Sequence, residues 1–375
     1  MFATECSDPS IEAPGYAATV YPPVDPFEVE LPAGWIVFGP GTLERVPEVV
    51  ERVGSGRTML VAGGSAAAIA EPIRARLGGR IVVTHDDVRQ HVPEDLANVA
   101  VRRARDANVD GVITVGGGSS IGLGKVVAVS LELPLIAVPT TYSGSEMTPV
   151  YGITGATKIT RRDVRALPRA VVYDPSVTLG LPPRVTATSG LNALAHCMEA
   201  IVGPGATPPS ALVAREAAAL LPDALRACIR DGSDLAARSV ALYASFLAGR
   251  SLALAGTGLQ HKLAHILGGR YGAIHAEVHS VLLPHVAAYH EAEAPAAMTT
   301  LARALGIEGD PSDALRRLAI DIGSPLSLEE LGLPRASIDV AIQDLDGSYD
   351  AAAIRALLEN AFVPMMRTST EGGSS

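Results

Sequence analysis

The chain has 375 residues, of which 48% are hydrophobic, and a formal net charge of −10. This length is enough for two domains with sizeable cores. No block of Lys or Arg stands out, which argues against nucleic acid as a partner, because phosphate binding requires clustered cations. The 3 cysteines are widely spaced and form no CxxC pair. A thiolate zinc site is therefore excluded, and a reducing compartment is expected.

The two ends of the chain differ from the rest in composition. Residues 1–30 are rich in proline and predict an irregular N-terminal extension. They contain no basic region followed by an apolar stretch, so they do not resemble a secretory signal. Residues 367–375 are small and polar and predict a flexible tail. No apolar run approaches the ~20 residues that span a bilayer, so we expect a cytoplasmic protein without a membrane partner.

Residues 31–178 alternate short β-branched runs with Ala-rich helical stretches, which predicts an α/β domain. Strands alternating with helices indicate βαβ units and a mostly parallel sheet. Strands are predicted at 58–64, 80–85, 111–116, 135–141 and 169–175, and helices at 66–78, 97–108 and from about 121 onward.

Residues 179–366 are Ala- and Leu-rich at helical spacing and predict an all-α second domain. Helices are predicted at 187–202, 208–230, 234–254, 258–268, 293–305, 311–322 and 350–361. We expect a cleft between the two domains.

A run of three glycines follows the strand at 111–116 and precedes a helix, in the segment GGGSSIGLGK (116–125). Glycine lets the backbone approach a pyrophosphate closely, and a helix N-terminus supplies free N–H groups. The segment matches neither GxGxxG nor the P-loop pattern, and a simple tight turn would explain the glycines alone. Ser119, Ser120 and Lys125 add hydrogen-bond donors, which favours phosphate binding.

A hydroxyl-rich segment, PTTYSGSE (139–146), follows the next predicted strand. It would lie at the carboxyl edge of the sheet, where open α/β sheets bind ligands. By itself this segment is more typical of a loop that caps a helix.

Most of the histidines lie in the predicted helical domain. Asn192 and His196, His261 and His265, and His275 and His279 are each four residues apart. Residues at this spacing share one face of a helix, so several imidazoles can converge on one cleft. A single buried histidine is more often a structural residue, but three spaced pairs favour a functional site.

These three motifs, in this order, resemble the iron-containing alcohol dehydrogenase superfamily, which shares its architecture with dehydroquinate synthase. The resemblance runs from about residue 36 to residue 286. It implies a dinucleotide-binding α/β domain, a helical domain, a nicotinamide cofactor in the cleft between them and a homodimer.

In metal-dependent members of the superfamily an Asp and three histidines hold iron or zinc. The positions that match here are Asn192, His196, His261 and His275, so an amide replaces the only carboxylate. An amide offers a neutral oxygen and should bind a divalent cation more weakly. The same replacement, with SGLNALAHCMEA (189–200) and HAEVHSVLLPH (275–285), resembles the maleylacetate reductase branch. We therefore expect no metal.

The resemblance implies roles for individual residues. Cofactor-binding residues would be Gly116, Gly117, Gly118, Ser119, Ser120, Thr140, Thr141 and Ser145. Catalytic residues would be His196, His261, Lys262, His265 and His275. Substrate residues would be Tyr142, Asn192, Arg270 and His279. The turn after the first strand, Gly63-Gly64-Ser65, has no acid to bind a ribose hydroxyl, so both NADH and NADPH are candidates.

Three functions follow from these expectations. The first is a metal-independent NAD(P)H-dependent reductase that acts on maleylacetate, giving 3-oxoadipate, or on a similar small dicarboxylate. The second is a zinc- or iron-dependent dehydrogenase of a small alcohol or aldehyde. The third is a relative recruited to a non-redox or specialised step, because Gln260 and Arg270 differ from what the resemblance leads us to expect near the pocket.

Overall fold

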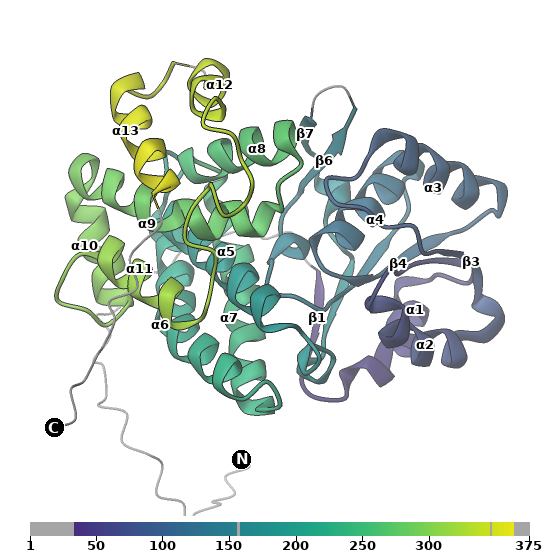
Figure 1. Ribbon diagram of the computed structural model, residues 1–375. Coiled ribbons are helices and arrows are strands. Elements are labelled where there is room, and N and C mark those ends of the chain that lie inside the picture. Colours follow the sequence, from purple (N-terminus) through teal and green to yellow (C-terminus); the bar gives the residue numbers. More distant parts are fainter. Residues whose placement is uncertain (1–33, 156–157, 346, 364–375) are drawn as a thin grey trace, which may run out of the picture. The chain divides into compact units, whose positions relative to one another are not determined.

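The computed structural model describes residues 34–155, 158–345 and 347–363. The predicted extension (1–30) and tail (367–375) lie outside these residues. The described residues belong to one compact unit, in which a sheet with its helices lies beside a large helical part (Figure 1).

The sheet has six strands in the order β1-β8-β5-β4-β2-β3, and every neighbouring pair is parallel. Its strands are β1 (Trp35–Phe38), β2 (Thr58–Val61), β3 (Ile81–His85), β4 (Gly111–Gly116), β5 (Leu135–Pro139) and β8 (Ala170–Tyr173). The predicted parallel sheet is confirmed. Strand β1 was not predicted, because four residues at a sheet edge are too few to show a period.

Helices cover both faces of the sheet. In β2, Leu60 packs on one face with α1 (Val46–Val53) and α2 (Ala66–Leu77). Its neighbours Met59 and Val61 pack on the other face with α3 (Glu94–Asp106) and α4 (Gly118–Leu131). Successive side chains of a strand point to opposite faces, so the continuous apolar run of β2 fills two cores.

An antiparallel hairpin of β6 (Val150–Thr154) and β7 (Lys158–Arg162) forms a separate two-stranded sheet. This hairpin was not predicted. Its sequence, with charged residues in the second strand and a glycine in the first, lacks the apolar alternation that marks a half-buried strand.

The described residues after β8 are mostly helical, as predicted. Its helices are α5 (Pro183–Val202), α6 (Pro208–Arg230), α7 (Leu235–Ala255), α8 (Leu259–Tyr271), α9 (His275–Glu293), α10 (Pro295–Ala304), α11 (Pro311–Asp321), α12 (Ser337–Asp344) and α13 (Ala351–Phe362). Helices α9 and α12 were not among the helices predicted from the sequence. The predicted helix at 293–305 begins at Pro295 instead, because proline suits the first turn of a new helix.

Helix α5 lies at the centre of the helical part, against α6, α7 and α9. Every residue from Thr186 to Ile201 is buried. Polar side chains within this stretch therefore need partners or a function.

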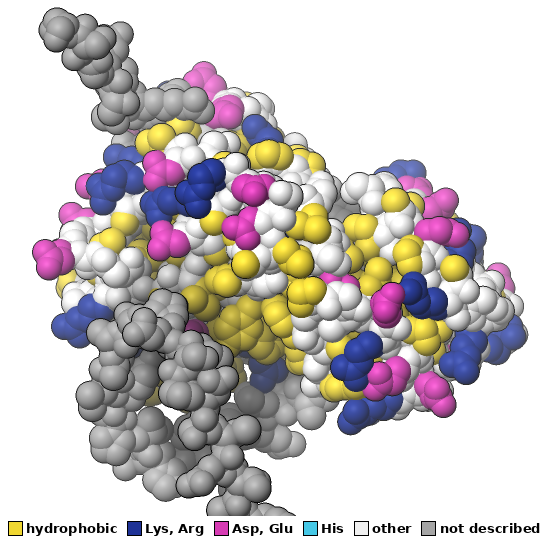
Figure 2. Space-filling view, turned by 90° about the horizontal axis from the view of Figure 1, so that it is seen from below, with side chains coloured by type: hydrophobic (Ala, Val, Ile, Leu, Met, Phe, Trp, Pro, Cys, Tyr) yellow, Lys and Arg dark blue, Asp and Glu magenta, His cyan; other side chains and the backbone are white. Residues whose placement is uncertain are grey.

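Within the described residues, no single helix is both long and apolar enough to cross a membrane, although α7 and α8 meet the length and composition criteria as a sharply bent pair. On the face seen in Figure 2, hydrophobic side chains gather near the middle, and acidic and basic side chains are interspersed around them.

Candidate active site

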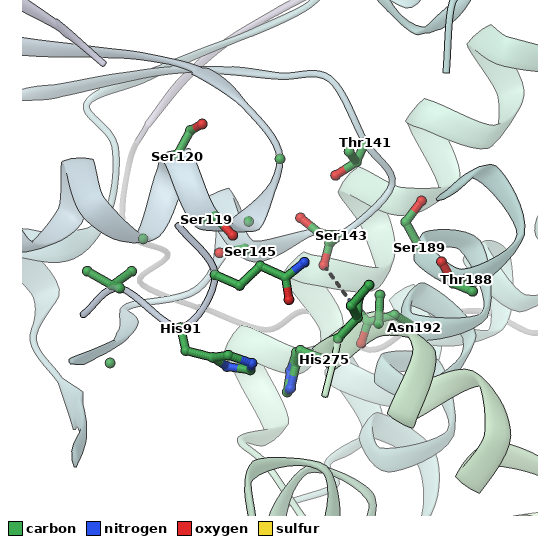
Figure 3. Close-up of a pocket in the computed structure, with 18 of the residues that line it drawn as sticks. His91, Ser119, Ser120, Thr141, Ser143, Ser145, Thr188, Ser189, Asn192 and His275 are labelled. Atoms are coloured by element: carbon green, nitrogen blue, oxygen red, sulfur yellow. Dashed lines mark hydrogen bonds between the residues drawn. The ribbon is translucent and has the colours of Figure 1, made fainter. Parts of the chain in front are cut away.

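A cavity of about 800 Å³ lies at the carboxyl edge of the parallel sheet. The turns after β2, β4 and β5 form one wall, and residues of α5, α8 and α9 form the other. Parallel strands all end at the same edge, which is why segments distant in sequence meet here. Figure 3 shows serines from the sheet side facing Asn192 and His275 of the helical side.

The glycine turn lies at the N-terminus of α4. Gly116 ends β4 with φ 142°, and Gly117 is the N-cap residue. A Cβ on Gly117 would lie 2.9 Å from Thr141 Cγ2, so the turn passes directly over the β5 loop. The first N–H groups of a helix have no partner within the helix and carry a positive partial charge. The turn therefore fits the pyrophosphate of a dinucleotide.

Six of the eight residues predicted to bind cofactor line the cavity, namely Gly117, Gly118, Ser119, Ser120, Thr141 and Ser145. Gly116 and Thr140 lie behind this wall, where the Thr140 N–H donates to the Gly116 carbonyl at 3.1 Å. This bond holds the two turns side by side.

Lys125 does not lie on the cavity wall, and the expectation that it adds a donor for phosphate is wrong. Its side chain is fully buried, and Nζ donates to the carbonyls of Ser145, Thr148 and Val150 at 2.6, 2.7 and 2.9 Å. Burial lowers the pKa of Lys125 to about 7, although nearby Glu146 opposes the shift. The lysine therefore shapes the loop after β5 from behind.

Four of the five predicted catalytic residues line the cavity: His196, His261, His265 and His275. His196 and His261 stack with ring centroids 5.1 Å apart, and His265 stacks on His275 at 5.3 Å. Burial, followed by the charge of neighbouring His261, holds the pKa of His196 well below its usual range. This helix face thus presents a neutral imidazole to the cavity.

Glu199 is the main site residue that was not predicted from the sequence. Its carboxylate is 1% exposed and accepts the backbone N–H groups of Gly258 and His261, each at 3.0 Å. It also forms a short contact with Nδ1 of His261. A carboxylate accepts only, so Nδ1 carries the proton and Nε2 is left for other partners. Glu199 follows His196 by three residues, and this helical spacing could have identified it.

Asn192 lies on the same helix face, one turn before His196. Its Nδ2 donates to the Ser143 carbonyl at 3.3 Å, a bond that joins α5 to the loop after β5 (Figure 3). Among the described residues its Oδ1 has no hydrogen-bond partner, although the side chain is only 4% exposed. A buried acceptor that faces a cavity without a partner points to a ligand.

His279 lies behind His275 and is fully buried, so it does not line the cavity. Its Nε2 is 3.1 Å from Nε2 of His275. On its other side, Gln260 Nε2 donates to the His279 carbonyl at 2.9 Å and lies 3.2 Å from Nδ1. The carbonyl can only accept, which fixes the orientation of the amide. Nδ1 of His279 therefore accepts, and its Nε2 donates to His275.

Three further predicted residues lie away from the cavity wall. Tyr142 is fully buried, and Arg238 donates to its hydroxyl at 3.1 Å. Arg270 forms an exposed ion pair with Asp344 at 2.7 Å. Lys262 lies 5.1 Å over the ring of Tyr349. Each of these three side chains therefore contacts residues of the helical part and does not line the cavity.

Among the described residues, the charged ones that line the cavity, apart from histidines, are Arg184 and Glu277. Their side chains form an ion pair at 2.5 Å, and Arg184 is also 3.7 Å from Glu330. Hydrogen bonding to Glu277 raises the pKa of Arg184. Neither residue could be identified from the sequence alone, because their pairing joins the start of α5 to the start of α9.

A metal held as in metal-dependent relatives would need Asn192, His196, His261 and His275 to converge on one point. Among the described residues, no three His, Cys, Asp or Glu side chains are arranged to hold an ion. Glu199 engages one nitrogen of His261, and His279 engages Nε2 of His275. The remaining ligand is a neutral amide. The residues present do not fit a divalent cation in this arrangement.

Comparisons with known proteins show the family of this chain. Residues 33–175 match the family model for iron-containing alcohol dehydrogenase, and residues 186–369 match the C-terminal model of the same family. The chain is 42% identical over 344 residues to a maleylacetate reductase from Burkholderia cepacia, covering 90% of this chain and 97% of that protein. A maleylacetate reductase from Pseudomonas knackmussii is 41% identical, covering 87% and 95%.

Solved structures show the same fold. The maleylacetate reductase from Agrobacterium tumefaciens has a TM-score of 0.83 at 36% identity, covering 90% of this chain and 99% of that one. An iron-containing alcohol dehydrogenase from Corynebacterium glutamicum has a TM-score of 0.84 at 34% identity, covering 91% and 98%. The chain belongs to the iron-containing alcohol dehydrogenase family of oxidoreductases.

Proposed function

We propose that this enzyme uses NADH or NADPH to reduce the conjugated double bond of maleylacetate, giving 3-oxoadipate, without a metal ion. The observation that carries the proposal is the wall of the cavity. It presents an amide and several imidazoles where metal-dependent relatives hold an ion, opposite a glycine turn that fits a dinucleotide. The proposal is also supported by the 42% identity between this chain and a maleylacetate reductase, which covers 97% of that protein.

The glycine turn and the serines after β5 would orient the cofactor in the cavity. A nicotinamide held there would supply the hydride that adds to the alkene carbon β to the ketone. Negative charge then develops on the ketone oxygen as an enolate. A preorganised hydrogen-bond donor at that oxygen stabilises such charge.

His261 is the residue best placed to stabilise the enolate. Glu199 occupies Nδ1 and orients the ring, and His196 and His265 flank it. When the Nε2 of His261 carries a proton, it can donate to the developing oxyanion. A proton must also reach the carbon α to the ketone to complete the reduction, and a water molecule oriented by the cavity-lining imidazoles of His265 and His275 is suited to supply it.

The substrate carboxylates require positive or N–H partners. Among four candidate partners on α8 and α9, His265 lines the cavity, and Lys262, Arg270 and His279 do not. Arg184 lines the wall and pairs with Glu277 through Nε. Its guanidinium has further N–H groups, so we assign it one carboxylate.

The test is an assay of NADH and NADPH oxidation with maleylacetate, before and after treatment with a chelator. We expect turnover with at least one cofactor, unchanged by the chelator. Comparing the KM values of the two cofactors then gives the preference. Absence of turnover with both cofactors would contradict the substrate. Turnover lost on chelation and restored by zinc or iron would contradict the metal-independent mechanism and favour a metal-dependent dehydrogenase.

A further inference from the structure

The segment of residues 86–93, here called the strap, joins β3 to α3 and was not singled out by the sequence. Val88, Gln90, His91 and Val92 of the strap line the cavity. His91 thus adds an imidazole from the sheet side to a histidine set that otherwise comes from the helical side.

The backbone of the strap is held in a strained conformation. His91 has φ 61° and Val92 has φ 48°. The left-handed region is unfavourable for a β-branched residue, and the α conformation is disfavoured before a proline such as Pro93. Such strain persists only where neighbouring groups enforce it, and it is frequent at ligand clamps.

Thr154 of β6 enforces this conformation. Its Oγ1 donates to the His91 carbonyl at 2.7 Å, and its N–H donates to the Val92 carbonyl at 3.0 Å. Val92 is 5% exposed, and a Cβ on Gly122 of α4 would lie 3.1 Å from its Cγ2. The strap is therefore fixed on the sheet side of the cavity.

The imidazole of His91 reaches across to the helical side. Its Nε2 lies 3.0 Å from the carbonyl oxygen of Ala273, in the turn between α8 and α9. The carbonyl accepts only, so Nε2 of His91 carries the proton and donates. A Cβ on Gly268 of α8 would lie 3.3 Å from His91 Cε1, so the ring also packs on that helix.

The bond ends two residues before His275, which begins α9 and stacks on His265. Figure 3 shows the ring of His91 directed toward His275. The turn at 272–274 sets where α9 begins, and the donor at His91 holds that turn from the opposite wall. This contact joins residues 182 apart in sequence across the cavity.

We propose that His91 is a positioning residue: it fastens the strap to the 272–274 turn, fixes His275 at the start of α9 and closes the histidine end of the cavity. The kinetic part of the proposal rests on the proposed reductase function, while the structural part does not.

The test compares His91→Ala, His91→Gln and Arg89→Gln with the wild-type enzyme. Glutamine keeps an N–H donor for the Ala273 carbonyl. Arg89 belongs to the same strap but pairs with Asp87 at the surface, so its variant is the matched control. A fourth variant, Thr154→Val, removes the Oγ1 bond and keeps the backbone bond. Melting temperatures identify any variant that fails to fold.

The structural readout is amide hydrogen exchange over residues 270–278. We expect exchange about 5- to 10-fold faster in His91→Ala, the size expected for one buried hydrogen bond. Thr154→Val should show a smaller increase, and His91→Gln and Arg89→Gln should be close to wild type. Equal exchange in His91→Ala and Arg89→Gln would overturn the proposal.

The kinetic readout is the KM of maleylacetate against that of NADH. We expect His91→Ala to raise the KM of maleylacetate about 5- to 10-fold and leave the KM of NADH within about 2-fold, with rescue by His91→Gln. An equal rise in both KM values would overturn the positioning role. If the wild-type enzyme does not reduce maleylacetate, the proposed function fails, and the exchange comparison alone decides whether His91 fastens the strap.

Discussion

At the scale of single residues, Glu199 is a buried carboxylate that is stabilised by the hydrogen bonds it accepts. One of these bonds also orients the ring of His261. Glu199 is 1% exposed and accepts from two backbone N–H groups and from Nδ1 of His261. A carboxylate is buried at acceptable free energy only when it is paired or hydrogen-bonded in this way. Its orientation of His261 parallels the carboxylate partners that orient metal-bound histidines in other enzymes.

We predict that Glu199→Gln weakens both stability and turnover. The amide N–H₂ group would face donors where the carboxylate accepted, at a cost of roughly 1–3 kcal/mol in the free energy of unfolding. His261 would lose its fixed orientation, and kcat should fall on the order of tenfold or more. Thermal unfolding and steady-state kinetics measure both effects. Glu216→Gln, on an exposed position of α6, is the control, and equal kcat in the two variants would contradict the role of Glu199.

At the scale of elements, α7 meets the loop after β5 through two glycines. A Cβ on Gly249 would collide with the carbonyl oxygen of Gly144, and it would lie 3.0 Å from the Gly144 Cα. Gly144 itself has φ 65°, which favours glycine. Since Ser143 and Ser145 flank this contact and line the cavity, the helix sets the position of the cavity wall.

We predict that Gly249→Ala destabilises the protein by about 1–3 kcal/mol, because backbone must move to admit the methyl group. The KM of the cofactor should also rise as the loop is displaced. Gly180→Ala is the control, since a Cβ there meets nothing within 4 Å, and its effect should stay within about 0.5 kcal/mol. Denaturant unfolding and cofactor titration test this pair. Equal stability of the two variants would contradict the prediction, because it would mean that the loop after β5 moves to admit the methyl group at no cost in free energy.

At the scale of the whole molecule, buried histidines make the fold sensitive to acid. Burial lowers the pKa of His285 to about 4, with Arg316 adding to the shift. Burial is also the largest cause of the lowered pKa values of His85 and His290. The unfolded chain therefore binds more protons than the folded one between the lowered pKa and the ordinary value of 6.5.

We predict that stability is fully present above pH 6.5 and is lost as the pH falls from 6.5 towards 4. Each such histidine contributes a slope of about 1.4 kcal/mol per pH unit within its window. Unfolding free energies measured at several pH values check the sign. His285→Gln should flatten the slope by about one proton. An unchanged slope in that variant would mean that His285 does not titrate in this window.

The sequence by itself determined the class of fold and most of the sheet-side wall of the cavity. Buried parallel strands are continuous apolar runs, and the turns between them carry glycine and hydroxyl residues that stand out in the sequence. The strands β2, β4 and β5 and the glycine turn at Gly117 were accordingly predicted close to their observed places. Helical spacing also predicted that His196, His261, His265 and His275 would gather, because a four-residue interval places side chains on one face.

The tertiary structure alone decided which charged and polar groups face the cavity. Lys125 and Arg270 were predicted from the sequence to be ligand-binding cations. In the structure Lys125 is buried under the loop after β5, and Arg270 pairs with Asp344. Glu199, Arg184 and His91 acquire their roles from partners 62, 93 and 182 residues away. Periodicity reports which face of an element is buried, but pairing between elements depends on how they pack, and that information is not local in the chain.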